Sequence, residues 1–153
     1  MEDTLQYAFF ILLAPLTALA ALSLTAYARW RYPSRQSASL VWLNVPTTGW
    51  LLANTLELIN PTQKGTFFWS QVTYSFIAFT AVAWLAFSLR YTEHTHWLNI
   101  RRLGWVFIVP SFTLAAIWIP GLNHWIWPAQ HFTSVLGMLA INVDYGPYFW
   151  VHS

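Results

Sequence analysis

Four long apolar stretches, separated by short charged segments, dominate the hydrophobic pattern of the chain. They cover residues 4–28, 40–59, 67–89 and 103–119. A helix needs roughly 17 to 25 apolar residues to cross the ~30 Å hydrocarbon core of a bilayer, so each stretch has the length of a membrane span. A further apolar segment, residues 147–153, has the character of a fifth span in its opening turns. We therefore expect four full spans, the start of a fifth, and an incomplete chain.

The composition supports a membrane protein and excludes several other classes. Of the 153 residues, 57% are hydrophobic and only 8% are charged, against about 25% charged in soluble domains. The net charge of +2 gives no sign of nucleic-acid binding, and the absence of cysteine removes disulfides and thiolate metal sites. The sequence predicts an all-α integral membrane protein, a polytopic transmembrane helix bundle whose main partner is the lipid bilayer. We expect residues 1–153 to be part of one such transmembrane domain.

The basic residues predict how the chain is oriented. Six of the seven lie between the first and second or the third and fourth stretches, and only Lys64 lies on the other side. Because basic loops stay in the cytoplasm, we expect a multi-pass protein of the bacterial inner membrane with its N-terminus outside. Ala18-Leu19-Ala20 fits a signal-peptide cleavage site, but the acidic Glu2 and Asp3 favour an uncleaved span. Tryptophans fall at both predicted boundaries, as lipid anchors do: Trp30, Trp42, Trp97 and Trp105 inside, Trp69, Trp118, Trp125 and Trp127 outside.

The polar segment after the fourth stretch, residues 120–146, is expected outside the membrane. Within it, residues 131–136 and 139–144 have the pattern of two short strands, and Gly137-Met138 lies between them. We expect a short extracellular β-hairpin that caps the bundle.

Polar residues inside the predicted spans mark a candidate ligand site, because such groups are costly in lipid. The second stretch carries a polar face with Trp50, Asn54 and Glu57 near its outer end, and the third carries Gln71 and Tyr74 at a similar depth. These residues could form an outward-facing ligand pocket. Alternatively, they form hydrogen bonds between helices, with Glu57 reaching to the outer headgroups.

Motifs for catalysis, metals and cofactors are missing. The sequence has no HExxH, GxSxG or phosphate-binding loop, no histidine at the centre of a span, and no lysine placed for a retinal Schiff base. His94 and His96 near Glu93 form only a weak metal pattern, which we interpret as a solvated loop. We predict no catalytic residue, metal or cofactor.

Several short motifs follow one another in an order that resembles a known family. The second stretch holds Trp-x6-Glu, and the third carries aromatic motifs. The fourth follows two arginines and contains a proline, and a histidine-containing turn and a Gly-Pro-aromatic motif come after it. In order, the residues are Trp50 and Glu57; Phe68-Trp69 and Tyr74; the run from Trp84 to Thr92; Arg101-Arg102 and Pro110; His124 and Ile126-Trp127; Gly146-Pro147-Tyr148-Phe149-Trp150. Together they resemble the seven-helix N-terminal sensor region of bacterial histidine kinases.

The resemblance implies a non-catalytic sensory input module of a two-component system. Such a module detects an extracellular or membrane signal, a small molecule for example, and relays it to a cytoplasmic output domain that these residues do not contain. Homodimerisation, or association with other membrane subunits, would be usual, and His124 in the outer turn joins the candidate site. Two alternatives stay open: an accessory or structural subunit of a larger membrane complex, and a transporter fragment, although no inverted repeat is visible.

Overall fold

The computed structural model describes residues 2–92, 100–135 and 138–152. Its main elements are four long helices, two strands and a short last helix: α1 Glu2–Arg31, α2 Arg35–Ile59, α3 Gln63–Tyr91, α4 Ile100–Trp118, the 3-10 turn η2 Asn123–Trp125, β1 Gln130–Val135, β2 Met138–Val143 and α5 Pro147–His152. Three predictions fall outside the described residues: the loop with His94 and His96, the membrane anchor Trp97, and Gly137 as the first residue of the turn.

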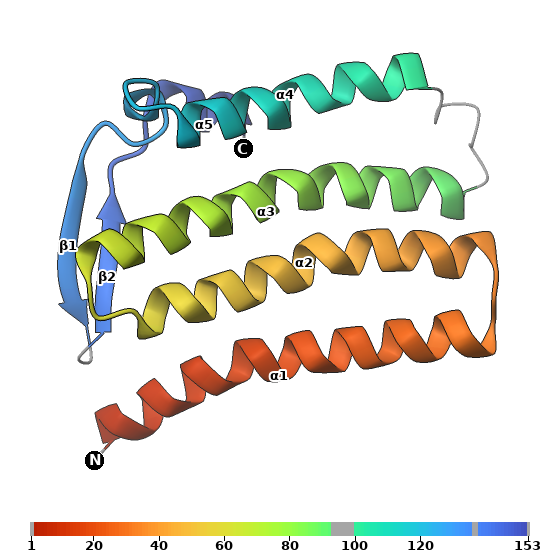
Figure 1. The fold of residues 1–153 in the computed structure, drawn as a ribbon, viewed down its shortest axis with the longest axis horizontal. Helices are drawn as coiled ribbons and strands as arrows, with labels where there is room; N and C mark the ends of the chain where they lie inside the picture. Colours follow the sequence, from red (N-terminus) through yellow and green to blue (C-terminus); the bar gives the residue numbers. More distant parts are fainter. Residues whose placement is uncertain (1, 93–99, 136–137, 153) are drawn as a thin grey trace.

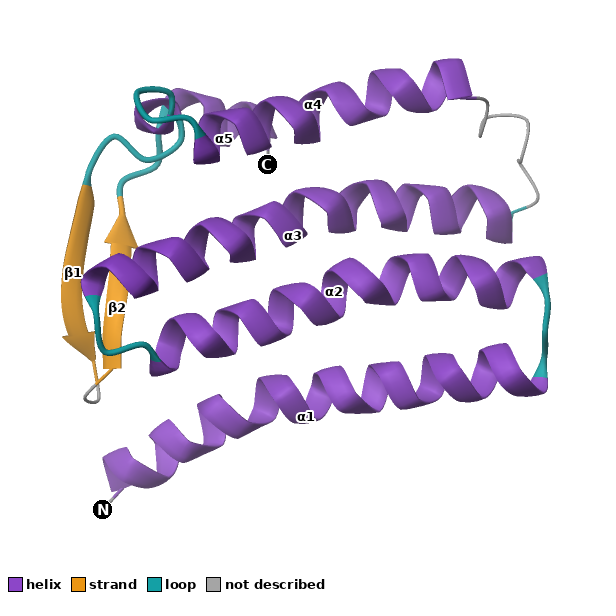
Figure 2. Cartoon of the chain, viewed as in Figure 1, coloured by secondary structure: helices purple, strands orange, loops and turns teal. Residues whose placement is uncertain are grey.

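The four long helices lie side by side in chain order and form a single layer (Figures 1 and 2). α1, α2 and α3 each cover one of the predicted stretches and extend beyond it, while α4 begins three residues before the fourth stretch and ends one residue before its end. By length and composition, the segments Ile11–Arg31 and Gln63–Tyr91 are able to cross a membrane, and Gly104–Trp118 is a shorter apolar segment. The expected helical membrane architecture is thus found, while four complete spans remain a prediction.

Short, well-capped turns join α1 to α2 and α2 to α3. Ser34 and Ser37 form a reciprocal capping box at the start of α2, at 3.0 and 3.1 Å. At the start of α3, the Thr62 hydroxyl accepts a hydrogen bond from the Gly65 amide at 3.2 Å. The connections are shorter than the gaps between the predicted stretches. The first loses residues to both α1 and α2, and the second loses residues to α3.

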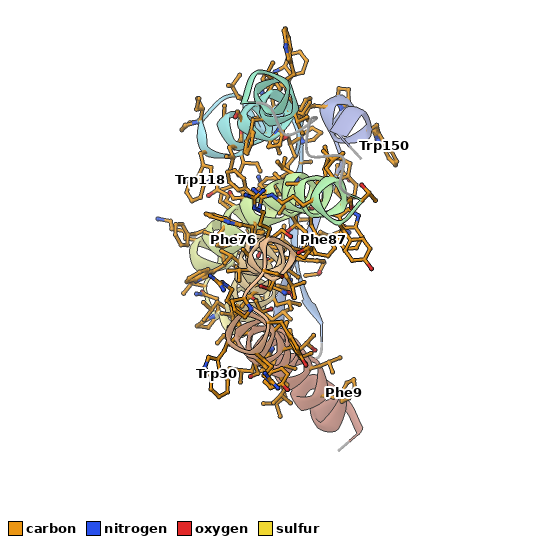
Figure 3. All side chains as sticks on the ribbon, turned by 90° about the vertical axis from the view of Figure 1, so that its right-hand side faces the viewer. Phe9, Trp30, Phe76, Phe87, Trp118 and Trp150 are labelled. Atoms are coloured by element: carbon orange, nitrogen blue, oxygen red, sulfur yellow. The ribbon has the colours of Figure 1, made fainter. Side chains whose placement is uncertain are left out.

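The layer buries small and polar side chains and exposes large apolar ones. Its buried residues include Ala18, Ala53, Ala78, Thr66 and Thr73. Phe9 and Trp30 on α1 and Trp150 on α5, by contrast, are exposed and point outward (Figure 3). A soluble protein has the opposite pattern. Helices in lipid pack through small residues and gain little from burying large ones, so this arrangement is that of a membrane protein.

Side-chain hydrogen bonds connect neighbouring helices across the layer. The Asn44 amide on α2 donates to the Thr25 hydroxyl on α1 at 2.6 Å. On α5, the Tyr148 hydroxyl lies 3.0 Å from the Thr113 hydroxyl and donates to the Val109 carbonyl at 3.2 Å. In the absence of water such bonds hold helices in register, each contributing about 0.6 kcal/mol.

β1 and β2 pair antiparallel, from Gln130 opposite Val143 to Val135 opposite Met138. They lie across one end of the layer, where β2 contacts α2 and α3 (Figure 1). We call this the strand end of the layer. The opposite end, where α1 and α3 finish in Arg31 and Tyr91 and α2 begins at Arg35, is the arginine end.

Trp127 corrects one prediction from the sequence. It was expected to anchor the chain in lipid, but it is only 2% exposed. Its indole lies in an apolar cluster with Ile117 and Ile126, and Phe67 packs edge-on against it at a ring-centroid distance of 6.0 Å. The segment that follows α4 folds back over the layer, so that Trp127 becomes part of the protein core instead of its lipid surface. Trp125, two residues earlier, is half-exposed, as an anchor would be.

Candidate functional site

A polar cavity of about 270 Å³ lies at the strand end, between α2, α3 and the segment that begins with β2. Its walls are formed by residues of α2, α3 and β2 and by one residue that follows β2. They are Trp50, Asn54 and Glu57 on α2; Ser70, Thr73, Tyr74 and Ile77 on α3; Ile141, Asn142 and Val143 on β2; and Tyr145. Four of the six candidate residues, Trp50, Asn54, Glu57 and Tyr74, therefore line a single space.

Helical periodicity explains why these side chains meet. Trp50, Asn54 and Glu57 follow one another at intervals of four and three residues, which places them on one face of α2. The α3 residues repeat at the same intervals, starting from Ser70. Because α2 and α3 run antiparallel and pack closely, the two faces lie opposite each other near the Asn60–Thr62 turn.

Glu57 is the only acidic residue of α2, α3 and α4. The hydroxyls of Ser70 and Thr73 face its carboxyl group from α3. Thr73 is 4% exposed, and its hydroxyl has no partner at full hydrogen-bonding geometry among the residues that the structure describes. Glu57 and the two hydroxyls together form the polar part of the cavity wall.

Tyr74 connects the cavity to the apolar cluster behind it. Its ring packs edge-on against Trp127, with centroids 4.9 Å apart, and its hydroxyl interacts with Tyr145. The segment after β2 is held in place by the Gly146 amide, which donates to the Ile126 carbonyl at 2.8 Å. A Cβ atom at Gly146 would collide with the Trp125 carbonyl, so only glycine allows this approach.

Gln71 and His124 are placed elsewhere. The Gln71 amide donates to the Ile117 carbonyl at 2.7 Å, and so joins α3 to α4. This is the interhelical role that the sequence left open as an alternative. His124 is exposed in η2, where its ring lies 5.7 Å from that of Trp125.

Sequence reasoning did not single out the residues contributed by the segment after α4. Asn142 and Tyr145 line the cavity, and so do Ser70 and Thr73 on α3. Ser70 and Thr73 share the periodicity of Tyr74, a signal that was available. Whether Asn142 and Tyr145 line the cavity depends on where β2 packs against the helices, and periodicity does not determine that position.

The described residues contain no group of three or more histidine, aspartate or glutamate side chains that could hold a metal ion. The cavity has instead one carboxylate, neutral hydroxyls and amides, and aromatic rings. This set of groups is suited to binding a small polar molecule by contact and hydrogen bonding.

The fold and the cavity together define a class: a helical membrane protein with a small polar pocket at one end. The chain belongs to the family described as the N-terminal 7TM region of histidine kinase, which it matches over residues 13–153. Comparison with the curated proteins finds no match, and neither does comparison with the solved structures.

Membership of this family identifies the chain as a membrane region of the bacterial sensor type, the sensory input part of histidine kinases. It agrees with the resemblance found in the motifs. The comparisons give no support to the alternative of an accessory subunit.

Proposed function

We propose that this chain is the input module of a bacterial two-component signalling protein. The strand end faces the outside of the cytoplasmic membrane, the four long helices span it, and the β1–β2 pair is extracellular. A small molecule enters the cavity around Glu57 and shifts the arrangement of the helices. An output domain on the cytoplasmic side reads that shift.

The distribution of basic residues supports this orientation. Arg29, Arg31, Arg35 and Arg90 all lie at the arginine end, and residues 101 and 102 add two more arginines at the start of α4. Only Lys64 is at the strand end. An excess of basic residues marks the cytoplasmic side of a membrane protein. The N-terminus, which is at the strand end in Figure 1, is then outside.

The observation that carries the proposal is the convergence of Trp50, Asn54, Glu57 and Tyr74 on one cavity beneath β2. A ligand there touches α2, α3 and β2 at once. It can favour one arrangement of these elements only through a difference in affinity between two arrangements. The Gln71–Ile117 bond joins α3 to α4, and the contact between Tyr74 and Trp127 joins α3 to the segment that follows α4. A displacement at the cavity can therefore reach α2, α3 and α4.

The test is a transcriptional reporter controlled by the signalling protein that carries this region. Glu57→Gln removes the charge from the cavity with little change in shape, and we expect it to lower the response to the inducing signal at least about tenfold. Asp144→Asn is the matched control, because that carboxylate is exposed, does not line the cavity and pairs with His131. A Glu57→Gln protein that responds like the wild type would contradict the proposal.

A further inference from the structure

We propose that the cavity binds a small organic ammonium ion that carries at least one N–H group. This inference rests on the proposed function, because it names the chemical class of the signal molecule. Three independent features of the walls support it: a carboxylate without a cationic partner among the described residues, a set of aromatic rings and a set of hydrogen-bond acceptors.

The first feature is the charge. Of the described residues that line the cavity, Glu57 is the only charged one. The salt bridge found in the described part of the chain lies elsewhere, between the exposed His131 Nε2 and Asp144 Oδ2 at 3.8 Å. Intramembrane carboxylates normally pair with a cation or serve a function. A cationic ligand would supply the charge that the described residues do not place beside Glu57, whereas an anion would be repelled.

The second feature is the aromatic wall. Trp50 comes from α2, Tyr74 from α3 and Tyr145 from the segment after β2, so three separate elements each bring one ring to the same space. Aromatic faces attract cations, and organic ammonium ions are bound by sets of rings of this kind. Metal ions prefer several carboxylate or imidazole ligands, and the described residues offer only one such group here.

The third feature is the supply of acceptors. Asn54 and Asn142 contribute amide oxygens, and the Ser70 and Thr73 hydroxyls face the carboxylate. An N–H of the ligand can satisfy these groups, whereas a quaternary ammonium cannot. Ile77 and Ile141 leave room for a short alkyl group, and the volume of about 270 Å³ limits the ligand to a small one.

Isothermal titration calorimetry of the chain in lipid nanodiscs at neutral pH tests the proposal with four probes. n-Butylammonium is the expected ligand type, butyramide its neutral counterpart and butyrate its anionic one, while tetramethylammonium is a cation without N–H. We expect saturable binding of n-butylammonium, with the other three at least about tenfold weaker. Equal binding of butyramide or butyrate, or no saturable binding of n-butylammonium, would overturn the inference. This comparison uses the unmodified protein and needs no variant to fold.

Variants then locate the site. Glu57→Gln should weaken n-butylammonium binding at least about tenfold, while Asp144→Asn should leave it unchanged. Tyr145→Phe should retain binding and Tyr145→Ala should lose it, because the ring and not the hydroxyl contacts the cation. Unchanged affinity in Glu57→Gln would place the cation elsewhere and reject the site.

The calorimetry and the reporter assay fail independently. If the reporter depends on Glu57 but n-butylammonium does not bind, the ligand class is wrong and the sensing role stands. If n-butylammonium binds through Glu57 but the reporter ignores Glu57, the cation site stands and the sensing role is wrong.

Discussion

Two cavities that are both lined by α2 and α3 differ in size, polarity and charge. The one at the strand end measures about 270 Å³, contains Glu57 and is lined in part by β2. The one toward the arginine end measures about 490 Å³ and is lined by apolar residues such as Trp42, Phe76 and Phe107, with Arg90 as its single charged residue. Helix packing alone therefore does not create a polar site. The polar cavity needs the folded segment after α4, which covers one end of the layer with protein.

This contrast extends to how the two ends are held together. At the strand end, large side chains such as Trp127, Ile117 and Ile126 are buried against one another, as in a soluble core. Away from it, α2 and α3 approach through small residues: Gly49 lies directly against the Phe76 ring, and Ala78 is fully buried. The free energy of unfolding should therefore fall when side-chain volume is removed at the strand end. Between α2 and α3 it should fall when side-chain volume is added.

The largest effect is expected for Trp127→Ala. Removing a buried indole from the apolar cluster should lower the free energy of unfolding by about 3–5 kcal/mol. The matched control is Trp125→Ala, at a half-exposed indole two residues earlier, which should change stability by less than about 1 kcal/mol. Thermal unfolding in detergent, followed by near-UV circular dichroism, compares the two. Equal losses would show that the strand end has no soluble-type core.

Gly49→Ala tests the opposite kind of packing. A Cβ atom at Gly49 would overlap the Phe76 ring, so we expect a loss of about 1–3 kcal/mol from overpacking between α2 and α3. Gly104→Ala on α4 meets no atom within 4 Å and should be neutral or slightly stabilising. The double variant Gly49→Ala/Phe76→Leu should recover part of the loss. If Gly49→Ala were as stable as Gly104→Ala, the close approach of α2 and α3 would be wrong.

Gln71→Leu separates a structural polar residue from the candidate site. It removes the hydrogen bond to the Ile117 carbonyl and should lower stability by about 0.6–1.7 kcal/mol, the range measured for such bonds in membranes. It should leave the affinity for n-butylammonium within about twofold, because Gln71 does not line the cavity. A Gln71→Leu protein that loses ligand binding as Glu57→Gln does would place both residues in one site.

The sequence predicts the elements well and the site in part. The length of the apolar stretches locates α1 to α4, and the two strand-like segments, residues 131–136 and 139–144, locate β1 and β2 to within one residue. Periodicity also brings Trp50, Asn54 and Glu57 onto one face of α2. It cannot decide which neighbour a polar residue faces: Gln71 and Tyr74 lie three residues apart on α3, yet one bonds to α4 and the other lines the cavity.

The sequence could not predict that Trp127 is buried or that Tyr145 lines the cavity, for a related reason. Both depend on the path of the chain after α4, which turns at Gly121 with a φ of +93° and folds back over α3 and α4. An amphipathic ring fits both a headgroup layer and a protein core, so composition alone cannot distinguish the two. The tertiary packing determines which of these two environments the ring occupies.

The central claim is that the cavity end of the layer faces the outside of the cell. The chain contains no cysteine, so single cysteines can be introduced without background. Thr133→Cys places a thiol on β1 at the strand end, and Tyr32→Cys places one in the exposed turn at the arginine end. With a membrane-impermeant maleimide on intact cells, the account predicts labelling at position 133 and, at position 32, labelling only after lysis. Labelling at 32 with protection at 133 would contradict it.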